Sequence, residues 1–369
     1  MKRLVVKVGT NTLTGGGDGL SRVQMLGIAR QIARLVREGH QVALVSSGAI
    51  VAGRQALSKN DKLGTGHGKD IPFKQVLAAV GQAKLMQAWD RLFSAEDVIV
   101  AQTLLTRADL ADRQGYLNAR NTLLALLERD VVPIINENDV VATEEIKIGD
   151  NDNLSALVAN LIDADLLILL TDQAGLYTAD PRRSPTATLI PEVRVITDEI
   201  VALAAGAGTA RGIGGMATKV QAARLATESG VTVLVACGTT DNVLIRAVKG
   251  ERVGTRFPSN RTRMDSRKRW ILSGLAGKAA AQIDAGAVMA LSRGRSLLPA
   301  GIAGVTGRFD RGDSVNIVGP DGKTVGCGVA NYNAADLERI KGCRSAEITQ
   351  ILGYHLGDEV IHRNNVVML

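Results

Sequence analysis

The hydrophobic positions of residues 1–257 fall into short apolar runs separated by longer amphipathic segments. The apolar runs predict buried strands at 3–8, 41–45, 97–102, 131–136, 165–171 and 231–236. The amphipathic segments predict helices at 22–37, 73–93, 116–129, 153–163 and 215–229. Strands that alternate with helices are typical of βαβ units. We therefore expect an α/β domain over 1–257, with a mainly parallel sheet sandwiched by helices.

The pattern changes after residue 257. Residues 258–276 are polar and basic and predict a linker. Short β-like runs rich in glycine follow, namely AQIDAGAVMAL, SLLPAGIAGV and DSVNIVGPDGKTVGCGVANY. The sequence Gly-Pro-Asp-Gly at 319–322 is a hairpin signal. We therefore predict a small all-β or barrel-like domain over 277–357, followed by a tail at 358–369.

Composition and charge limit the class of protein. Apolar residues make up 46% and aromatic residues 3%, so Val, Ile, Leu and Ala must fill the core, as in helices packed on a parallel sheet. The sequence shows no signal peptide and no apolar stretch approaching the ~20 residues that span a bilayer. Its three cysteines are scattered and odd in number, which argues against a disulfide framework. We expect a cytoplasmic protein without membrane contact. The net charge of +7 fits nucleic acid or anionic metabolites and does not choose between them.

Ligands of a doubly wound sheet bind beyond the carboxyl ends of its strands. The predicted first strand ends with Lys7 and Val8, and Gly9 and a glycine cluster at 15–17 follow. Glycines let backbone N–H groups approach phosphate oxygens, and Lys7 supplies a positive charge. The motif is neither a Walker A nor a GxGxxG sequence, so an ordinary turn is the alternative.

Ser46, Ser47 and Gly48 follow the second predicted strand and open a helix. Small hydroxyl residues at such a position are usually N-caps, which is the interpretation we favour. The alternative is an anion-binding cradle made by the N–H groups of the same turn.

The segment 135–160 carries many amide and carboxylate side chains directly after a buried strand. Such groups suit the two ends of an amino acid. Asp139 can pair with an ammonium, Asn151 can donate to a carboxylate, and Asp152 can hold lysines in place. The alternative is a solvated polar loop with a cap for the next helix.

Two more loops complete the candidate site. Thr171 and Asp172 lie at the end of the fifth predicted strand, and the glycine-rich sequence 212–219 enters a helix with Lys219 in its first turn. A lysine there opposes the helix dipole, a conflict that a bound phosphate would resolve. Two lysines and two glycine loops, without a nearby histidine, indicate phosphoryl transfer by positioning and charge neutralisation. A carboxylate acceptor, with a reference pKa of about 4.3, needs no catalytic base.

Seven segments of the first domain resemble the amino-acid kinase superfamily, and within it the enzymes that phosphorylate glutamate. They are VVKVGTNTLT, VSSGAIVAG, LAAVGQAKLMQ, LLTRADLADRQGYLNARNTL, VPIINENDVVATEEIKIGDNDNLSALVA, LLTDQAGLYTADPR and GIGGMATKVQAA. RKRWILSG, and the stretch from SLLPAGIAGVTGRFDRGD to ITQILGY, resemble the PUA domain. The resemblance covers nearly the whole chain and is most specific over 130–182.

The resemblance implies an amino-acid kinase fold that converts ATP and L-glutamate to ADP and L-glutamyl 5-phosphate, the first step of proline biosynthesis. It implies catalysis by Lys7, Lys219 and Asp152. The residues implied for glutamate binding are Ser47, Gly48, Asn136, Asp139 and Asn151. Those implied for ATP binding are Lys7, Gly9, Thr171, Asp172, Ile213, Gly214, Gly215, Met216, Ala217, Thr218 and Lys219.

The same resemblance implies further partners. Mg²⁺ would accompany ATP and bridge its phosphates, with few protein ligands and no dedicated metal site. L-proline would act as a feedback inhibitor, and the chain would form a homo-oligomer, a dimer or a tetramer.

Two features depart from the family pattern. Ile213 and Ala217 stand where relatives usually carry small hydroxyl residues, so contacts with ATP there would come from the backbone. The polar segment 58–72 is longer than expected and is either a lid or a surface insertion, of which we favour the insertion.

Two alternatives remain at this point. One is an amino-acid kinase for another substrate, such as acetylglutamate or aspartate, although the GDNDNLSA sequence and the second domain favour glutamate. The other is an RNA-binding protein that acts through the PUA-like domain. Against it, the basic surplus is modest, with 15 Lys and Arg against 10 Asp and Glu over 258–369. After Trp270, only Phe309, Tyr332 and Tyr354 could stack on bases.

Overall fold

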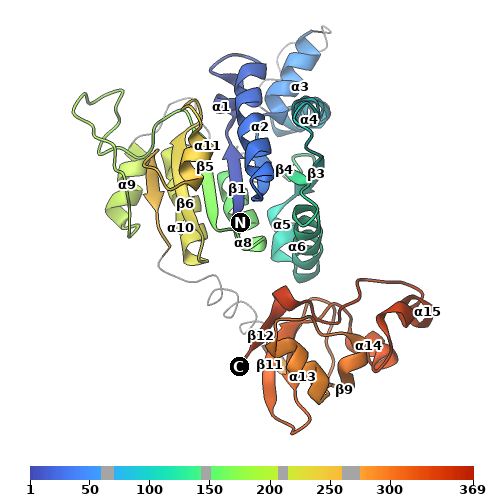
Figure 1. Cartoon of the computed structure of the whole chain (residues 1–369). Coiled ribbons are helices and arrows are strands. Elements are labelled where there is room, and N and C mark those ends of the chain that lie inside the picture. Colours follow the sequence, from blue (N-terminus) through green and yellow to red (C-terminus); the bar gives the residue numbers. More distant parts are fainter. Residues whose placement is uncertain (60–69, 143–150, 207–214, 260–274) are drawn as a thin grey trace. The chain divides into compact units, whose positions relative to one another are not determined.

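The computed structural model describes residues 1–59, 70–142, 151–206, 215–259 and 275–369. The chain forms two compact units (Figure 1). The first consists of Met1–Ala111 and Asn118–Arg263, and the second of Asp112–Leu117 and Met264–Leu369. None of the helices in these described ranges is long and apolar enough to cross a membrane.

In the described part of the first unit, seven strands form one sheet in the order β3-β4-β2-β1-β5-β6-β7. The strands are β1 (Arg3–Val8), β2 (Gln41–Ser46), β3 (Val100–Leu105), β4 (Val132–Glu137), β5 (Leu166–Thr171), β6 (Thr232–Cys237) and β7 (Thr255–Phe257). All neighbouring pairs are parallel except β6 and β7, which are antiparallel. The expected α/β fold with a mainly parallel sheet is confirmed.

Helices cover both faces of this sheet (Figure 1). On one face, α2 (Arg22–Arg37), α4 (Ile71–Ser94) and α11 (Val243–Val248) share a hydrophobic core with the strands. On the other face, α8 (Asp152–Leu161) packs on β1 and β5, and α10 (Met216–Glu228) packs on α8 and β6. The other helices in the described part of residues 1–257 are α1 (Thr10–Thr14), α3 (Ala49–Ser58), α5 (Arg107–Ala111), α6 (Arg113–Leu127) and α9 (Asp198–Gly206).

The central strand β1 sends alternate side chains to the two faces of the sheet. Leu4, Val6 and Val8 belong to the core beneath α2 and α4. Lys7 points to the opposite face and is buried beneath α8. The alternation of β1 therefore buries Lys7 in a strand whose other buried residues are apolar.

The predicted start of the strand at 97–102 is wrong, because β3 begins only at Val100. The preceding residues close helix α4. Asp97 adopts a left-handed conformation with φ of 56°, and Val98 donates its N–H to the carbonyl of Phe93. Such a bond from beyond a left-handed residue is typical of a helix C-terminus, so the apolar Val98 and Ile99 belong to a turn.

In the described part of the second unit, five strands form a sheet in the order β12-β11-β10-β8-β9. They are β8 (Leu275–Ile283), β9 (Ile302–Thr306), β10 (Ser314–Val318), β11 (Thr324–Val329) and β12 (Val366–Met368). The predicted hairpin is confirmed, since β10 and β11 are antiparallel and Gly322 turns between them with φ of 77°.

The described part of the second unit also contains helices beside this sheet. It contains α13 (Ala285–Ser292), α14 (Ala334–Ile340) and α15 (Ile348–Leu352). The run AQIDAGAVMAL was interpreted as β-like throughout, but it leaves the strand at Asp284. That side chain accepts a hydrogen bond from the N–H of Ala287 at 2.7 Å and caps α13.

Candidate active site

Four neighbouring strands bring their carboxyl ends together. In the sheet order β4-β2-β1-β5, these strands end at Glu137, Ser46, Val8 and Thr171. The chain leaves β1 toward β2 on one side, whereas β5 pairs with β1 on the other side. Such a reversal of winding opens a crevice at the carboxyl edge of a sheet. Nearly all the site residues predicted from the sequence lie at this edge.

A buried cluster of three charges occupies the edge. Lys7 Nζ lies 2.5 Å from Oδ1 of Asp152, and Lys219 Nζ lies 3.0 Å from Oδ2 of the same carboxylate. Thr218 donates its hydroxyl to that Oδ2 at 2.9 Å. Asp152 is the first residue of α8 and is fully buried, and both lysines are also buried. The sequence-based idea that Asp152 could hold lysines therefore agrees with the geometry.

The cluster contains more positive than negative charge. Two lysine side chains face one carboxylate, so the formal charges of the three groups leave one positive charge in a buried place. A buried charge without compensation is costly, and an anion bound beside the lysines would compensate it. The arrangement therefore favours an anionic ligand such as a phosphate group.

A chain of side-chain amides lies beside this cluster. Asn151 Nδ2 donates to Asn136 Oδ1 at 2.8 Å, to Ser47 Oγ at 3.2 Å and to the carbonyl of Ser46 at 3.3 Å. Asn136 Nδ2 donates in turn to Oε1 of Gln82 at 2.8 Å. Asp139 follows in the loop after β4 and is half-buried. Polar groups of β2, β4 and α8 thus line one region, as recognition of a small polar substrate requires.

The interpretation of Ser46 and Ser47 as helix N-caps is wrong. Ser46 Oγ accepts a hydrogen bond from Trp89 Nε1 at 2.9 Å, and Ser47 Oγ accepts one from Asn151. The N-cap of α3 is Gly48 in the left-handed region, with φ of 104°. A Cβ at Gly48 would also lie 3.1 Å from Cδ1 of Leu13, so glycine suits this turn sterically as well.

The predicted nucleotide residues lie around the same edge. Thr171 Oγ1 donates to Oδ1 of Asp172 at 3.0 Å, and Asn11 Nδ2 donates to Oδ2 of Asp172 at 3.2 Å. A Cβ at Gly9 would lie 3.7 Å from Nζ of Lys7, so the backbone passes close to this lysine. Gly215 is the N-cap of α10, which begins with Met216, Ala217 and Thr218. Ile213 and Gly214 lie outside the described residues, as does most of the segment 58–72.

The segment after β5 contains a strong local ion pair. Asp180 Oδ1 accepts from the backbone N–H and from Nε of Arg182, at 3.0 and 2.9 Å, and Oδ2 accepts from Nη2 at 3.0 Å. The hydrogen-bonded guanidinium lowers the pKa of the Asp180 carboxyl below its ordinary value. This pair stabilises the turn at 180–184, where the N–H groups of Arg183 and Ser184 also donate to the carbonyl of Asp180.

The described residues provide few ligands for a metal ion. Among the described residues, no group of three or more His, Cys, Asp or Glu side chains is placed to hold a metal ion. The buried carboxylate of Asp152 already faces two lysines. These residues suit a cation that arrives with phosphate oxygens as its main ligands, the usual mode of Mg²⁺ with a nucleotide.

Three residues of the site were missed by sequence reasoning: Gln82, Trp89 and Asn11. Gln82 lies in the quoted segment LAAVGQAKLMQ, and that segment was the available signal, whereas Trp89 lies farther along the same helix and outside every quoted segment. Asn11 lies in the quoted sequence after Gly9, and its amide character next to a phosphate-type loop was the available signal.

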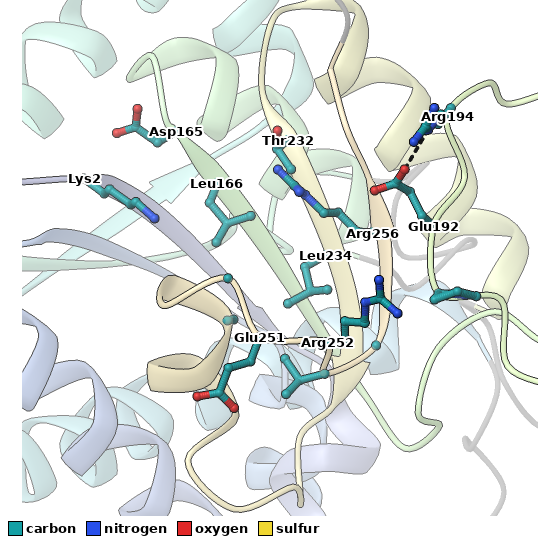
Figure 2. A pocket seen from close by; sticks show the side chains of 15 residues that line it. Lys2, Asp165, Leu166, Glu192, Arg194, Thr232, Leu234, Glu251, Arg252 and Arg256 are labelled. Carbon is teal, nitrogen blue, oxygen red and sulfur yellow. Dashed lines mark hydrogen bonds and ion pairs between the residues drawn. The ribbon is translucent and has the colours of Figure 1, made fainter.

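A cavity of about 500 Å³ lies elsewhere, at the amino end of the sheet (Figure 2). Its lining includes Lys2 and Asp165, which precede β1 and β5, and the exposed Arg252 and Arg256. Arg194 and Glu192, whose Nε and Oε1 form an ion pair at 2.8 Å, also line it (Figure 2). None of the predicted site residues lines this cavity. Its size therefore does not make it the active site.

Known proteins match the chain along both units. The amino acid kinase family model matches residues 2–237, and the PUA domain model matches residues 280–352. The chain is 55% identical over 366 residues to a protein of Herpetosiphon aurantiacus named glutamate 5-kinase, which covers 99% of this chain and 98% of the relative. It is 52% identical over 373 residues to a protein of the same name from Dehalococcoides mccartyi, at 100% and 98% coverage. It is also 50% identical over 368 residues to a protein of the same name from Deinococcus radiodurans, and the match spans 100% of this chain and 100% of the relative.

Proposed function

The chain belongs to the amino acid kinase family and, within it, to the glutamate 5-kinases, and on this premise we propose that it transfers the γ-phosphoryl group of ATP to the side-chain carboxylate of L-glutamate. An oxygen of the carboxylate forms a bond to the γ-phosphorus, and the bond from that phosphorus to the β–γ bridging oxygen breaks. The products are ADP and L-glutamyl 5-phosphate, the first intermediate of proline biosynthesis. The carboxylate is already ionised at neutral pH, so no side chain has to remove a proton.

The buried cluster of Lys7, Asp152 and Lys219 carries this proposal. The two ammonium groups neutralise the negative charge spread over the oxygens of the transferring phosphoryl group. Asp152 accepts from both lysines and so fixes their separation before the nucleotide binds. Such preorganised charges stabilise a transition state without having to reorient during the reaction.

Glutamate binds beside this cluster, along the hydrogen-bonded side-chain amides of Gln82, Asn136 and Asn151, which we call the amide chain. Asp139 pairs with the ammonium of the substrate, and Asn151 and Ser47 contact its carboxylate groups. Asn136 supports Asn151 through the 2.8 Å hydrogen bond between them, and Gly48 supplies the tight turn that brings Ser47 into the site. These roles are supported by the hydrogen bonds that bring together polar groups from the end of β2, the end of β4 and the start of α8.

The nucleotide occupies the other side of the crevice, near Gly9, Thr171, Asp172 and the turn at 213–219. Ile213 and Ala217 carry no side-chain donor, so their contribution to ATP binding comes from the backbone. Mg²⁺, arriving with the phosphates of the nucleotide, would supply further neutralisation of negative charge. Asp172 lies at the strand end that faces these phosphates.

Other expected properties stay proposals. Feedback inhibition by L-proline, a homodimeric or homotetrameric assembly and a cytoplasmic location follow from the family, and RNA binding follows from the PUA domain alone. Kinases for acetylglutamate or aspartate remain the competing class for the first unit. The relatives named glutamate 5-kinase, which match over essentially the whole chain, favour glutamate.

A coupled assay tests the substrate directly. The purified full chain is incubated with ATP and Mg²⁺, and ADP release is compared for L-glutamate, N-acetylglutamate and L-aspartate. Hydroxylamine is included in parallel, because it converts an acyl phosphate to a coloured hydroxamate. We expect hydroxamate with L-glutamate at the highest kcat/KM. Preference for either of the other acids would refute the proposed substrate.

A further inference from the structure

Helix α4 presents three hydrogen-bonding side chains, seven residues apart, to the carboxyl ends of β2 and β4 and to the loop after β4. Seven residues are nearly two helical turns, so Gln75, Gln82 and Trp89 lie along one face of the helix. Each makes a hydrogen bond at or beyond the carboxyl ends of β2 and β4. The bonds run from Gln75 Nε2 to Val140 O at 3.0 Å, from Asn136 Nδ2 to Gln82 Oε1 at 2.8 Å, and from Trp89 Nε1 to Ser46 Oγ at 2.9 Å.

Close backbone packing fixes the middle of this helix. A Cβ at Gly81 would lie 1.7 Å from the carbonyl oxygen of Ala49, and one at Gly53 would lie 1.8 Å from that of Leu77. Any side chain larger than hydrogen at these positions would force α3 and α4 apart. Gln82 directly follows Gly81. The close contact between the backbones of Gly81 and Ala49 therefore fixes where the Gln82 side chain lies along the helix, relative to the ends of β2 and β4.

One carbonyl oxygen sets the direction of every bond in the amide chain. The carbonyl of Ser46 can only accept, so the side chain of Asn151 must turn its Nδ2 toward it. That Nδ2 also donates to Asn136, which must therefore turn its Oδ1 toward Asn151. Asn136 is left to donate from Nδ2, and Gln82 accepts with Oε1. Gln82 is the last acceptor of the chain.

The other atom of the Gln82 amide, Nε2, takes no part in the bonds between the side-chain amides. Among the described residues, Gln82 Nε2 is buried and has no hydrogen-bond partner. Burying an unpaired donor disfavours the folded state, and a methionine of similar length would avoid that cost. The value of an amide at this position therefore lies in the acceptor that it offers to Asn136.

We propose that Gln82 is a positioning residue of the glutamate site, a role that rests on the proposed function. Its Oε1 keeps Asn136 from rotating, and Asn136 keeps Nδ2 of Asn151 turned toward Ser46 and Ser47. Rotation of Asn136 would set its own Nδ2 against Nδ2 of Asn151, two donors without an acceptor between them. Asn151 would then turn away, and both its Oδ1 and the hydroxyl of Ser47 would lose the orientation in which they meet the amino acid. Gln82 thus acts on glutamate binding without touching glutamate.

Gln82→Met tests this role, since it keeps the length of the side chain and removes the acceptor. We expect the KM for L-glutamate to rise about tenfold, the effect of one lost buried hydrogen bond, while the KM for ATP changes less than twofold. Gln87→Met is the matched control, because Gln87 is exposed on the same helix and receives the same change. It should leave both KM values unchanged. If Gln82→Met does not fold, Gln82→Asn, which is one methylene too short to reach Asn136, replaces it with the same expectation.

A double-mutant cycle separates positioning from general structural damage. In an Asn136→Ala background, Gln82→Met should change the glutamate KM less than twofold, because its only route to the substrate is already lost. The proposal would be overturned if the two substitutions raised the glutamate KM by factors that simply multiply in the double variant. It would also be overturned by an unchanged glutamate KM in Gln82→Met, or by equal rises in the KM for glutamate and for ATP. Failure of the unaltered chain to phosphorylate glutamate would instead refute the proposed function, so the two failures are distinguishable.

Discussion

Lys7 Nζ lies 2.5 Å from Oδ1 of Asp152, although one residue lies near the end of the central strand and the other at the start of a helix far along the chain. The second oxygen of that carboxylate lies 3.0 Å from Nζ of Lys219. Asp152 therefore joins β1, α8 and α10 through one side chain. A change at this residue should affect stability and catalysis together, whereas a change at either lysine should mainly affect catalysis.

Lys219→Ala should lower kcat at least ~100-fold, the scale of losing one preorganised electrostatic group. The reason is that Lys219 supplies charge that is most needed when the phosphoryl group is between donor and acceptor. Steady-state ADP release measures the effect, with Lys84→Ala, an exposed lysine on α4, as control. Near wild-type kcat in Lys219→Ala would remove this residue from the mechanism.

Asp152→Asn should lower both kcat and Tm. The substitution leaves two buried lysines without their carboxylate, and breaking a buried ion pair from one side costs about 3–5 kcal/mol. Tripolyphosphate, an anion that can take over the neutralisation, should raise the Tm of the variant more than that of the wild type. Thermal unfolding with and without the anion measures this, and Asp90→Asn on the exposed side of α4 serves as control. An unchanged Tm would show that the carboxylate does not hold the lysines in solution.

Asp139→Ala should raise the KM for glutamate far more than the KM for ATP. The contact with the substrate ammonium exists already in the ground state, so its loss weakens binding before it slows chemistry. Initial rates over a matrix of both substrate concentrations separate the two constants, with Asp90→Ala as the matched control. Equal rises for both substrates would contradict the assignment of Asp139.

The sequence predicted the parts of the site that local patterns control. Strand β1 and helix α2 have the predicted bounds, because a compact apolar run and a regular amphipathic period each specify one local structure. The position of Lys7 follows from the end of that strand, and a meeting of strand-end residues follows from parallel topology. These features need no knowledge of how helices pack.

The parts that depend on tertiary contacts could not be predicted in this way. The role of Gln82 depends on the close packing of Gly81 against Ala49, which no periodicity reveals. Ser46 and Ser47 looked like N-caps because local propensity favours that use. Their hydroxyls are instead engaged by Trp89 and Asn151, which come from distant segments.

Tyr332→Phe should destabilise the second unit by about 1–2 kcal/mol. The buried phenol donates to the carbonyl of Gly357 at 2.6 Å and accepts from the N–H of Leu356 at 3.0 Å, so both backbone groups would lose a partner. Denaturant unfolding, followed by a probe in the second unit, measures the change. Tyr354→Phe is the comparison at an exposed position, where the phenol donates to the Asp336 carboxylate at the surface and its loss should cost less.

The same tyrosine should give a pH dependence. Burial raises the pKa of Tyr332 above its ordinary value of 10.0. Because the folded state holds the phenolic proton more tightly, the stabilisation is complete below the unfolded pKa and declines as pH rises beyond about 10. The difference in stability between wild type and Tyr332→Phe should therefore narrow above that pH. A constant difference from pH 8 to 11 would contradict the assignment.

A chain that ends at Pro258 should still make glutamyl phosphate. Every residue assigned to chemistry lies before position 220, and the truncation retains β7, whose Phe257 is fully buried beside β6. The sheet, the cluster around Asp152 and the amide chain are therefore all present in the shortened protein. Hydroxylamine trapping measures the product, with the full chain as reference and the Lys219→Ala variant of the shortened chain as the negative control. We expect hydroxamate at a rate within about tenfold of the full chain, because removal of residues 259–369 does not remove a charged group from the crevice. A folded, ATP-binding 1–258 chain that forms no hydroxamate would show that the second unit belongs to the catalytic machinery, and the division of labour inferred from the sequence would be wrong.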